Sequence, residues 1–417
     1  MRSLPKGRVE GKIRVPGSKS AVIRALAVAG LAPGRSTIHG GALSEDVMAM
    51  IGVLEALGVP VDIGEDPWVV DGGRLRPPEG PLDCGESGLT ARIAIALAAT
   101  VEGEVTVTGR GRLLERPMSP LVDVLHAQRI EATASPGGTL PVTVNGRDGW
   151  WGGEITVPTE TSTQFLSAVL IAAPTARYPV AIRVPDRAGA LGYVDLTVFL
   201  MAVFGARPIE TSGGYEVPDS GYRPASYTVP PDASSAVYPA VAAAITGGDV
   251  TLVGLARDDP QPDMAILGHL EAMGCRVVEN ETGVRVMGPD KLQPIDADLE
   301  RSPDGALGLA IACVFSSGPC RLSGLGTLRH KESDRLSAMA KGLRRLGAEV
   351  ETTTDSLVIT PAVTPTPARV EAFGDHRVAM SLALAGLRIG GVEVDHPQVV
   401  SKTWPGFWED MENLVRT

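Results

Sequence analysis

The sequence predicts an α/β protein of two domains, and three observations lead to this fold class. A polar segment followed by an Ala-rich apolar helix recurs six times, about every 70 residues. Most of these apolar stretches run into a short strand flanked by glycine. Several repeats then contain a second, amphipathic helix that ends in a Leu-Gly or Met-Gly turn. Each repeat is therefore predicted as strand, buried helix, strand, surface helix and one or two further strands.

The first repeat contains the stretch "VPGSKSAVIRALAVAGLA", residues 15–32. A helix that is apolar on nearly every side is a buried helix. Its N-terminus has unsatisfied N–H groups and the positive end of the helix dipole, and Ser18, Lys19 and Ser20 precede it, so it suits an anion. The alternative is an ordinary N-cap serine beside an incidental lysine. A nucleotide-binding P-loop does not fit, because Ser18 separates Gly17 from Lys19.

The later repeats show the same order of segments. Their polar segments lead into the helices "GESGLTARIAIALAAT", "ETSTQFLSAVLIAAP", "PDASSAVYPAVAAAITGG", "SPDGALGLAIACVFSSG" and "FGDHRVAMSLALAGLRIGG". The strands that follow include "GRSTIHG", "GEVTVTG", "GGDVTLVG", "GPCRLSG" and "GGVEVDH". The amphipathic helices are "EDVMAMIGVLEALGVPV", "DMAILGHLEAMGCRV" and "DRLSAMAKGLRRLGAEV".

Solenoid repeats are shorter, about 20–50 residues, so these units are better explained as small α/β modules clustered three to a domain. We expect the chain to cross between domains near Val15–Gly17 and Val229–Asp232. The first domain is then residues 1–16 with 231–417, and the second is residues 17–230. The N-termini of the six buried helices could converge on one cleft between these domains, or several could be plain helix caps.

Composition excludes several classes of protein. The formal net charge is −11 and no long Lys/Arg stripe occurs, which argues against nucleic acid as a partner. No run of 18 uncharged apolar residues occurs, and the first residues lack the apolar core of a signal peptide, which argues against a membrane span or export. The cysteines have no CxxC pair, so reduced cytoplasmic thiols are expected rather than disulfides or a zinc site; they are Cys84, Cys275, Cys313 and Cys320.

The polar segments differ in charge. Cations cluster at the first segment, at "GRGRLLERPM", at "RHKESDRL" and at "SKTWPGF", whereas the segment around Gln164 carries hydroxyls and an amide. For any one of these residues a solvated ion pair is the alternative. Several cations beside Asp304, Glu332 and His376 would instead combine anion binding with candidate proton-transfer groups.

In this order and spacing, the motifs "PGSKSAVIR", "ERP", "STQF", "DASSA", "PDGA", "HKESDRL", "GDHR" and "SKTWP" resemble one family along essentially the full chain. That family is the 3-phosphoshikimate 1-carboxyvinyltransferases (5-enolpyruvylshikimate-3-phosphate synthases), which are enolpyruvyl transferases. The resemblance implies two domains, each of three βαβαββ-like units around buried helices (an inside-out α/β barrel), with the ligands in the interdomain cleft. It implies transfer of the enolpyruvyl group of phosphoenolpyruvate to a hydroxyl of shikimate 3-phosphate, with release of phosphate, in aromatic amino-acid biosynthesis. No metal or organic cofactor is implied, and a cytoplasmic monomer is expected.

The same resemblance implies roles for individual residues. The residues expected to hold phosphoenolpyruvate are Lys19, Gly88, Arg116, Gln164, Arg335, Arg377 and Lys402. Those expected to hold the acceptor are Ser20, Arg24, Ser162, Thr163, Tyr193, Asp304 and Lys331. Asp304 is expected to take the proton of the attacking hydroxyl. Glu332, with Lys19, is expected to protonate the methylene carbon, and His376 has a supporting role.

The chain departs from the family pattern at Glu86, Leu89, Ala190 and Thr327, where Asn, Thr, Ser and Asn are more usual. Since these positions lie on or beside the acceptor side, one alternative is enolpyruvyl transfer to a different hydroxyl acceptor in a specialised pathway. A second alternative is a non-catalytic homologue that binds phosphoenolpyruvate, although Asp304 and Glu332 would then serve no purpose.

Two further activities fit the residues less well. The sister enzyme that acts on UDP-N-acetylglucosamine usually has a reactive cysteine in the loop that here is "GRGRLLERP". An NTP-dependent kinase would need a P-loop and magnesium carboxylates, and neither combination occurs.

Overall fold

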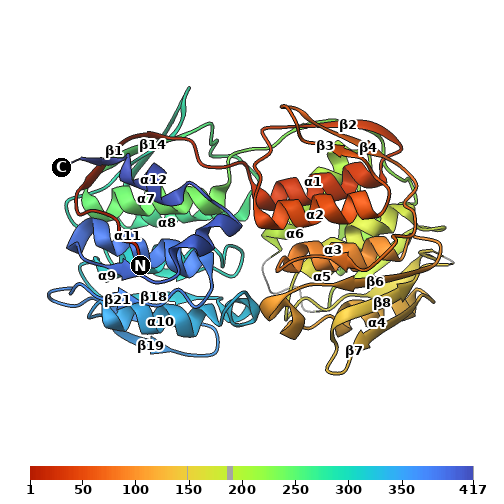
Figure 1. Ribbon diagram of the computed structural model, residues 1–417. Coiled ribbons are helices and arrows are strands. Elements are labelled where there is room, and N and C mark those ends of the chain that lie inside the picture. Colours follow the sequence, from red (N-terminus) through yellow and green to blue (C-terminus); the bar gives the residue numbers. More distant parts are fainter. Residues whose placement is uncertain (148, 186–190, 417) are drawn as a thin grey trace. The chain divides into compact units, whose positions relative to one another are not determined.

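The computed structural model describes residues 1–147, 149–185 and 191–416, and the chain separates into two compact units (Figure 1). Unit 1 is Met1–Pro16 with Pro230–Thr417, and unit 2 is Gly17–Val229. The chain therefore changes unit at Pro16–Gly17 and at Val229–Pro230, one residue before the second boundary that the sequence suggests.

Three buried helices form the centre of unit 2: α1 (Lys19–Leu31), α3 (Gly88–Ala98) and α5 (Gln164–Ala172). They contact one another. All residues of α3 are buried, as the apolar pattern on every side predicts. The outer helices are α2 (Glu45–Ala56), α4 (Ser119–Ala127) and α6 (Gly192–Val203).

The described strands of unit 2 form three sheets of one pattern. In each sheet, one edge strand is parallel to its neighbour, and the other two pairs of neighbouring strands are antiparallel. The first sheet is β13 (Ser226–Thr228), β2 (Gly34–His39), β4 (Trp68–Gly72) and β3 (Val61–Asp62). The second is β5 (Leu82–Asp83), β6 (Glu104–Thr108), β8 (Thr139–Asn145) and β7 (Glu131–Ser135). The third is β11 (Ile209–Thr211), β12 (Gly214–Val217), β10 (Val180–Arg183) and β9 (Gly153–Thr156).

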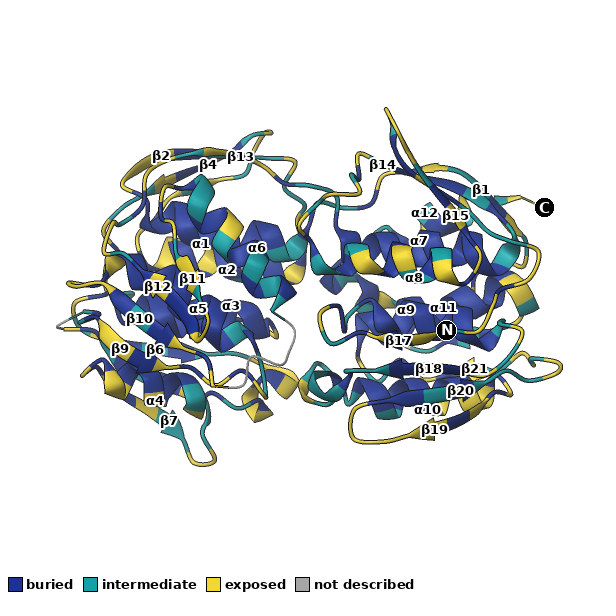
Figure 2. Ribbon diagram, turned by 180° about the vertical axis from the view of Figure 1, so that it is seen from behind, coloured by how far each residue is buried: buried dark blue, intermediate teal, exposed yellow. Residues whose placement is uncertain are grey.

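Unit 1 repeats this arrangement around α7 (Ala233–Thr246), α9 (Ala306–Val314) and α11 (His376–Ile389), which also contact one another. The buried helices α9 and α11 are dark blue in Figure 2. The outer helices are α8 (Ala265–Ala272), α10 (Arg335–Arg345) and α12 (Phe407–Glu412). One sheet is β15 (Arg276–Asn280), β16 (Gly283–Met287), β14 (Asp249–Val253), β1 (Arg8–Ile13) and β23 (Val415–Arg416). The others are β17 (Asp296–Asp298), β18 (Cys320–Ser323), β20 (Leu357–Thr360), β19 (Glu349–Thr352), and the short pair β21 (Arg369–Val370) and β22 (Glu393–Val394).

The predicted order of strand, buried helix, strand, surface helix and two strands is confirmed, for example in β5-α3-β6-α4-β7-β8. The sixth repeat is shorter, because α12 is followed by the single strand β23 instead of a two-stranded hairpin. The predicted fold class, α/β with three units around buried helices in each half, is confirmed. Within each unit the described strands form separate sheets rather than one closed ring.

The predicted helix-ending glycines have left-handed backbone. Gly58, Gly274 and Gly347 follow α2, α8 and α10 with φ of 81°, 100° and 96°. These angles are readily adopted only by glycine, which ends each helix and turns the chain into the next strand.

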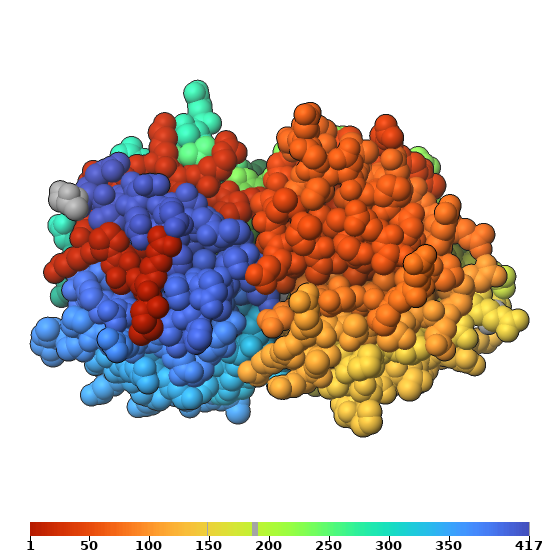
Figure 3. Space-filling view, in the orientation of Figure 1, coloured from red at the N-terminus to blue at the C-terminus, as the bar shows by residue number. Residues whose placement is uncertain are grey.

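The first strand closes its sheet with distant parts of the chain. Although β1 leads into α1, it pairs in parallel with β14, and β13 pairs in parallel with β2. The N-terminal residues also lie across the C-terminal part of unit 1 (Figure 3), where Gly7 N–H donates to Leu387 O at 3.0 Å.

Candidate functional site

The three buried helices of unit 2 begin at predicted ligand residues: α1 at Lys19, α3 at Gly88 and α5 at Gln164. Ser18 and Ser87 cap the first two, accepting from the N–H groups of Ala21 at 3.4 Å and Thr90 at 3.3 Å. The cap role considered for these serines is therefore real. It also leaves the first N–H groups of the helices pointing beyond the cap, which is the geometry that binds anions.

Lys19 has a carboxylate partner that the sequence did not reveal. Its Nζ lies 2.8 Å from Oδ2 of Asp46, in the first turn of α2. Both side chains are largely buried, with 14% and 8% exposed. Because Asp46 follows Ser44 and Glu45, it looks in the sequence like an ordinary acidic residue at a helix start.

Arg24 lies near two other predicted acceptor residues of unit 2, Ser20 and Tyr193. Its guanidinium donates to the Thr197 hydroxyl at 2.7 Å, to the Ser167 hydroxyl at 3.3 Å and to the Ser20 carbonyl at 3.0 Å. Its Cζ is 5.9 Å from the Tyr193 ring centroid. Burial lowers the pKa of Arg24 to about 10, so the group stays protonated at neutral pH. The structure thus brings Ser20, Arg24 and Tyr193 together.

Arg116, Gly88 and Gln164 also lie together. A Cβ on Gly88 would lie 2.2 Å from Nη1 of Arg116, so the guanidinium rests against the glycine backbone. Ser162 accepts from the Gln164 N–H at 3.3 Å, and Thr163 is buried beside it. A further residue, Arg92, donates to Gln164 Oε1 at 2.9 Å. The sequence motifs predict no role for Arg92.

The second set of predicted residues lies in unit 1, around Asp304 just before α9. Oδ1 of Asp304 is 2.9 Å from Arg335 Nη1 and 3.4 Å from Lys331 Nζ, and Oδ2 is 3.5 Å from Arg377 Nε. Only 13% of the Asp304 side chain is exposed. Three cations therefore surround one carboxylate, as the motifs predict.

Arg335 connects this carboxylate to two others. Its Nη2 is 2.8 Å from Glu332 Oε2 and its Nε is 2.8 Å from Asp375 Oδ2. Lys402, at the end of the 3₁₀ turn Pro397–Lys402, has its Nζ 3.9 Å from Glu332 Oε1. One guanidinium thus holds Asp304 and Glu332, the two predicted proton-transfer groups, in one cluster.

Asp375 is the member of this cluster whose part the sequence did not predict. It is fully buried and accepts from Arg335, from the Ser333 hydroxyl at 3.0 Å and from the Arg377 N–H at 2.9 Å. It caps α11 and orients Arg335 at the same time. His376, the predicted supporting residue, is fully buried, and its Nδ1 lies 3.8 Å from Asp375 Oδ1.

The charges in this cluster shift its acid–base properties. Burial by itself would raise the pKa of the Asp304 carboxyl, but Lys331, Arg377 and Arg335 outweigh it and hold the pKa well below its usual range. Burial opposes the charge of Arg335, yet Asp375, Glu332 and Asp304 raise its pKa further. The neighbouring charges therefore favour the ionised forms of both Asp304 and Arg335.

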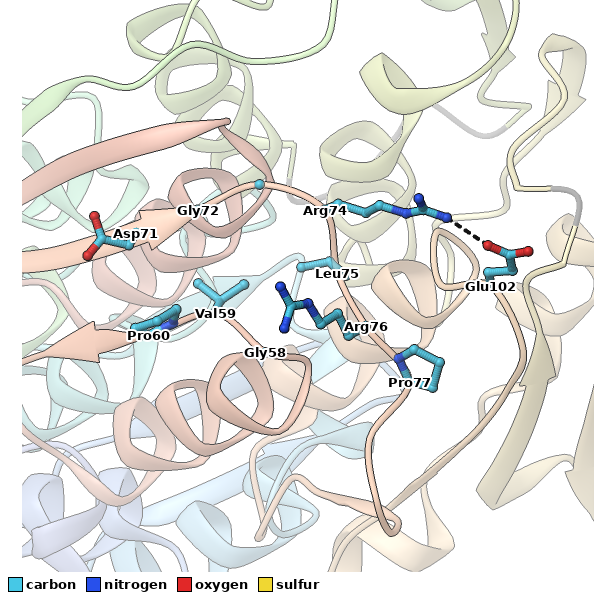
Figure 4. Close-up of a pocket in the computed structure, with 11 residues that line it drawn as sticks. Gly58, Val59, Pro60, Asp71, Gly72, Arg74, Leu75, Arg76, Pro77 and Glu102 are labelled. Atoms are coloured by element: carbon cyan, nitrogen blue, oxygen red, sulfur yellow. Dashed lines mark hydrogen bonds and ion pairs between the residues drawn. The ribbon is translucent and has the colours of Figure 1, made fainter.

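A cavity in unit 2 is lined by a different set of residues (Figure 4). It is lined by the chain after α2 and after β4, including Gly58, Asp71 and Arg76, and by the Arg74–Glu102 ion pair of 2.7 Å. No predicted site residue lines it. It adjoins helix C-termini, whose negative dipole ends do not favour anions.

Ala190 lies outside the described residues. Within the described chain, no group of three or more His, Cys, Asp or Glu side chains could hold a metal ion. No helix in the same residues is long and apolar enough to cross a membrane.

The chain is similar to known proteins of one family along nearly its whole length. The chain matches the family EPSP synthase (3-phosphoshikimate 1-carboxyvinyltransferase) over residues 4–411. It is 39% identical over 420 residues to the 3-phosphoshikimate 1-carboxyvinyltransferase of Syntrophobacter fumaroxidans, covering 98% of each chain. It is also 39% identical over 412 residues to the enzyme of that name from Methanoculleus marisnigri, covering 97% of this chain and 96% of the relative. The structure resembles EPSP synthase from Acinetobacter baumannii with a TM-score of 0.83 and 26% identity, covering 100% of this chain and 98% of the other.

Proposed function

Since this chain belongs to the EPSP synthase family, we propose that it transfers the enolpyruvyl group of phosphoenolpyruvate to a hydroxyl of shikimate 3-phosphate and releases phosphate. This reaction is a step of aromatic amino-acid biosynthesis. The observation that carries the proposal is the pair of carboxylates, Asp304 and Glu332, held by Arg335 among further cations. Binding alone would need the cations, whereas proton transfer needs the carboxylates.

The proposed phosphoenolpyruvate ligands come from both units. Unit 2 supplies Lys19, the Gly88 backbone, Arg116 and Gln164, and unit 1 supplies Arg335, Arg377 and Lys402. The proposed acceptor ligands are Ser20, Arg24, Ser162, Thr163 and Tyr193 from unit 2, and Asp304 and Lys331 from unit 1. Both ligands are multiply charged anions, and this many cations offsets the repulsion of bringing them together.

In the proposed reaction, Asp304 takes the proton of the acceptor hydroxyl, whose oxygen forms a bond to C2 of phosphoenolpyruvate. Glu332, with Lys19, delivers a proton to the methylene carbon C3, which makes C2 electrophilic. In the tetrahedral intermediate the bond from C2 to the phosphate oxygen then breaks. C3 loses a proton as the double bond re-forms, and phosphate leaves. No electron is gained or lost, so no redox group takes part.

The low pKa of Asp304 suggests how ligand binding prepares the base. Lys331, Arg377 and Arg335 stabilise its negative charge, so Asp304 by itself is a weak base. Anionic ligands would draw these cations to their own oxygens. The pKa of Asp304 would then rise toward the range in which a carboxylate accepts a proton from an attacking hydroxyl.

The test is release of phosphate from phosphoenolpyruvate in the presence of shikimate 3-phosphate, with Asp304→Ala and Glu332→Ala as variants. We expect the wild-type protein to release phosphate and each variant to lose about 10²–10⁴-fold in kcat, the usual contribution of a general acid or base. Binding of phosphoenolpyruvate to the variants, measured by calorimetry, controls for folding. No phosphate release by a wild-type protein that binds phosphoenolpyruvate would refute the proposal.

A different hydroxyl acceptor is the second candidate, and two departures from the family pattern beside proposed ligands favour testing it: Thr327 on the acceptor side and Glu86 on the phosphoenolpyruvate side. Thr327 lies half-buried in the 3₁₀ turn Gly326–His330, directly before Lys331. Glu86 lies against the loop that carries Arg116, since a Cβ on Gly111 would be 2.2 Å from its Oε1. Phosphate release with other hydroxyl compounds, but not with shikimate 3-phosphate, would support this candidate.

We also propose that the protein works in the cytoplasm as a monomer, without a metal or organic cofactor. The four cysteines are buried free thiols, which a reducing compartment preserves. Full activity after dialysis against a chelator, in a protein that elutes as a monomer, is the expected result.

A further inference from the structure

Arg92 of α3 connects three segments that contain proposed phosphoenolpyruvate ligands. Only 1% of it is exposed. Its Nη1 donates to the Gly88 carbonyl at 3.0 Å and to Gln164 Oε1 at 2.9 Å, and its Nη2 donates to the Pro117 carbonyl at 3.3 Å. Its Cζ also lies 4.8 Å from the Phe165 ring centroid. Two of these segments contain the proposed phosphoenolpyruvate ligands Gly88 and Gln164. The third contains Arg116, which directly precedes Pro117 and is also a proposed ligand.

The bond to Gln164 has a chemical consequence. A guanidinium has N–H donors and no acceptor, so Gln164 can meet it only with its carbonyl oxygen. The amide is planar, and its NH₂ group then faces away from Arg92. Gln164 is the first residue of α5 and is partly exposed, at the helix end that favours anions. With the opposite orientation the oxygen would face the ligand and repel it.

We propose that Arg92 is a positioning residue: it fixes the Gln164 amide with its NH₂ group toward phosphoenolpyruvate, so that Gln164 acts only as a donor. The inference rests on the proposed function, because it assumes that phosphoenolpyruvate is the anion at Gln164. Arg92 itself is too deeply buried to be a direct ligand. Its contribution passes through the orientation of another side chain.

The central experiment compares Arg92→Gln and Arg92→Lys. A glutamine at position 92 can donate or accept, so it no longer enforces one orientation of Gln164, whereas lysine can only donate. We expect Arg92→Gln to raise KM for phosphoenolpyruvate about tenfold or more, the effect of a lost bond to a charged group, with kcat nearly unchanged. Arg92→Lys should restore part of this loss.

A double-mutant cycle separates positioning from general structural support. In a Gln164→Ala background the orientation no longer matters, so Arg92→Gln should raise KM by much less than in the wild-type protein. An equal fold-change in both backgrounds would overturn the proposal. Gln164→Glu leaves Arg92 intact and guards against misfolding of the arginine variants. It should pair with Arg92, retain or raise Tm, and lose phosphoenolpyruvate binding because it presents a second oxygen to the anion.

Arg24→Gln is the matched control. Arg24 is equally buried on α1 and also donates to the carbonyl four residues earlier, but its other partners are the hydroxyls of Thr197 and Ser167. We expect it to change KM for the acceptor rather than for phosphoenolpyruvate.

Phosphoenolpyruvate binding by Gln164→Glu at the wild-type level would also overturn the proposal. Absence of turnover in the wild-type protein would instead count against the proposed function, so the two failures are distinguishable.

Discussion

Asp304 shows how a single residue balances the charges of the unit 1 cluster. The side chains of Lys331, Arg335 and Arg377 each have a nitrogen within 3.5 Å of its carboxylate oxygens. The side chain of Arg335 is only 1% exposed. Removing the charge of Asp304 would leave these cations without their shared counter-ion. Breaking one side of a buried ion pair is among the costlier changes in a protein.

We therefore expect Asp304→Asn to lower the free energy of unfolding by about 3 kcal/mol in a phosphate-free buffer. Inorganic phosphate should restore part of the loss by supplying negative charge among the cations. Urea unfolding with and without phosphate measures both effects. Asp71→Asn is the control, since Asp71 forms an exposed pair with Arg35 at 3.0 Å and should leave the stability nearly unchanged, with no effect of phosphate. A stable Asp304→Asn variant in phosphate-free buffer would contradict this view of the cluster.

The same carboxylate gives a pH dependence of defined sign. Its folded pKa is lowered, so its ionisation stabilises the fold fully above the unfolded pKa of about 3.9, and this contribution is lost as pH falls further. The stability difference between wild type and Asp304→Asn should therefore stay constant from about pH 5 to pH 8 and shrink only in stronger acid. A difference that already shrinks between pH 8 and pH 6 would show that the folded carboxyl has a raised pKa.

At the scale of elements, the buried helices approach closely where glycine faces a neighbouring helix. Gly308 of α9 faces α7, where an added Cβ would meet Cγ1 of Val237 at 2.5 Å. Valine is stiff at χ1 and cannot easily move aside. Gly268 of α8 has no atom within 4 Å of such a Cβ. The two glycines are both helical, but only the first is required by packing.

We expect Gly308→Ala to lower the free energy of unfolding by about 1–3 kcal/mol through overpacking. Gly268→Ala should raise it by about 0.5–1 kcal/mol, because alanine favours the helix and meets nothing. Both values follow from chemical denaturation of the single variants. An increase in stability for both would mean that α7 and α9 can move apart at no cost.

The elements also show what a sequence can reveal. Helix caps, apolar runs and Leu-Gly turns act within a few residues, so Ser18, Ser87 and Gly58 could be predicted from their neighbours. The partners of Lys19 and Gln164 could not, because Asp46 and Arg92 are distant along the chain and act through side chains alone. The pairing of β1 with β14 could not be predicted either, because another parallel partner strand would satisfy the same pattern of residues. Family motifs supplied the ligand assignment, which the local pattern alone left open.

At the scale of the whole molecule, the proposed ligand residues are divided between the two units. Bringing two sets of cations toward one ligand pair costs Coulomb repulsion until anions enter. We therefore expect small-angle scattering to show a smaller radius of gyration when phosphoenolpyruvate and shikimate 3-phosphate are both present. The Glu332→Ala variant should still compact if it binds both ligands, which separates the motion from turnover. An unchanged radius of gyration at saturation would contradict this expectation.

The pairing of β1 with β14 also determines the order in which the protein can mature during synthesis. Residues 17–229 include every described strand of unit 2, so that unit can finish folding while the ribosome is still making the rest. The first strand emerges earliest and must wait, unpaired, until Asp249–Val253 has been translated. An unpaired strand is a site for aggregation, and charged side chains are a common protection. Such charges are present on β1 at Arg8, Glu10 and Lys12. They would protect this strand from aggregation during the long interval before its partner strand is synthesised.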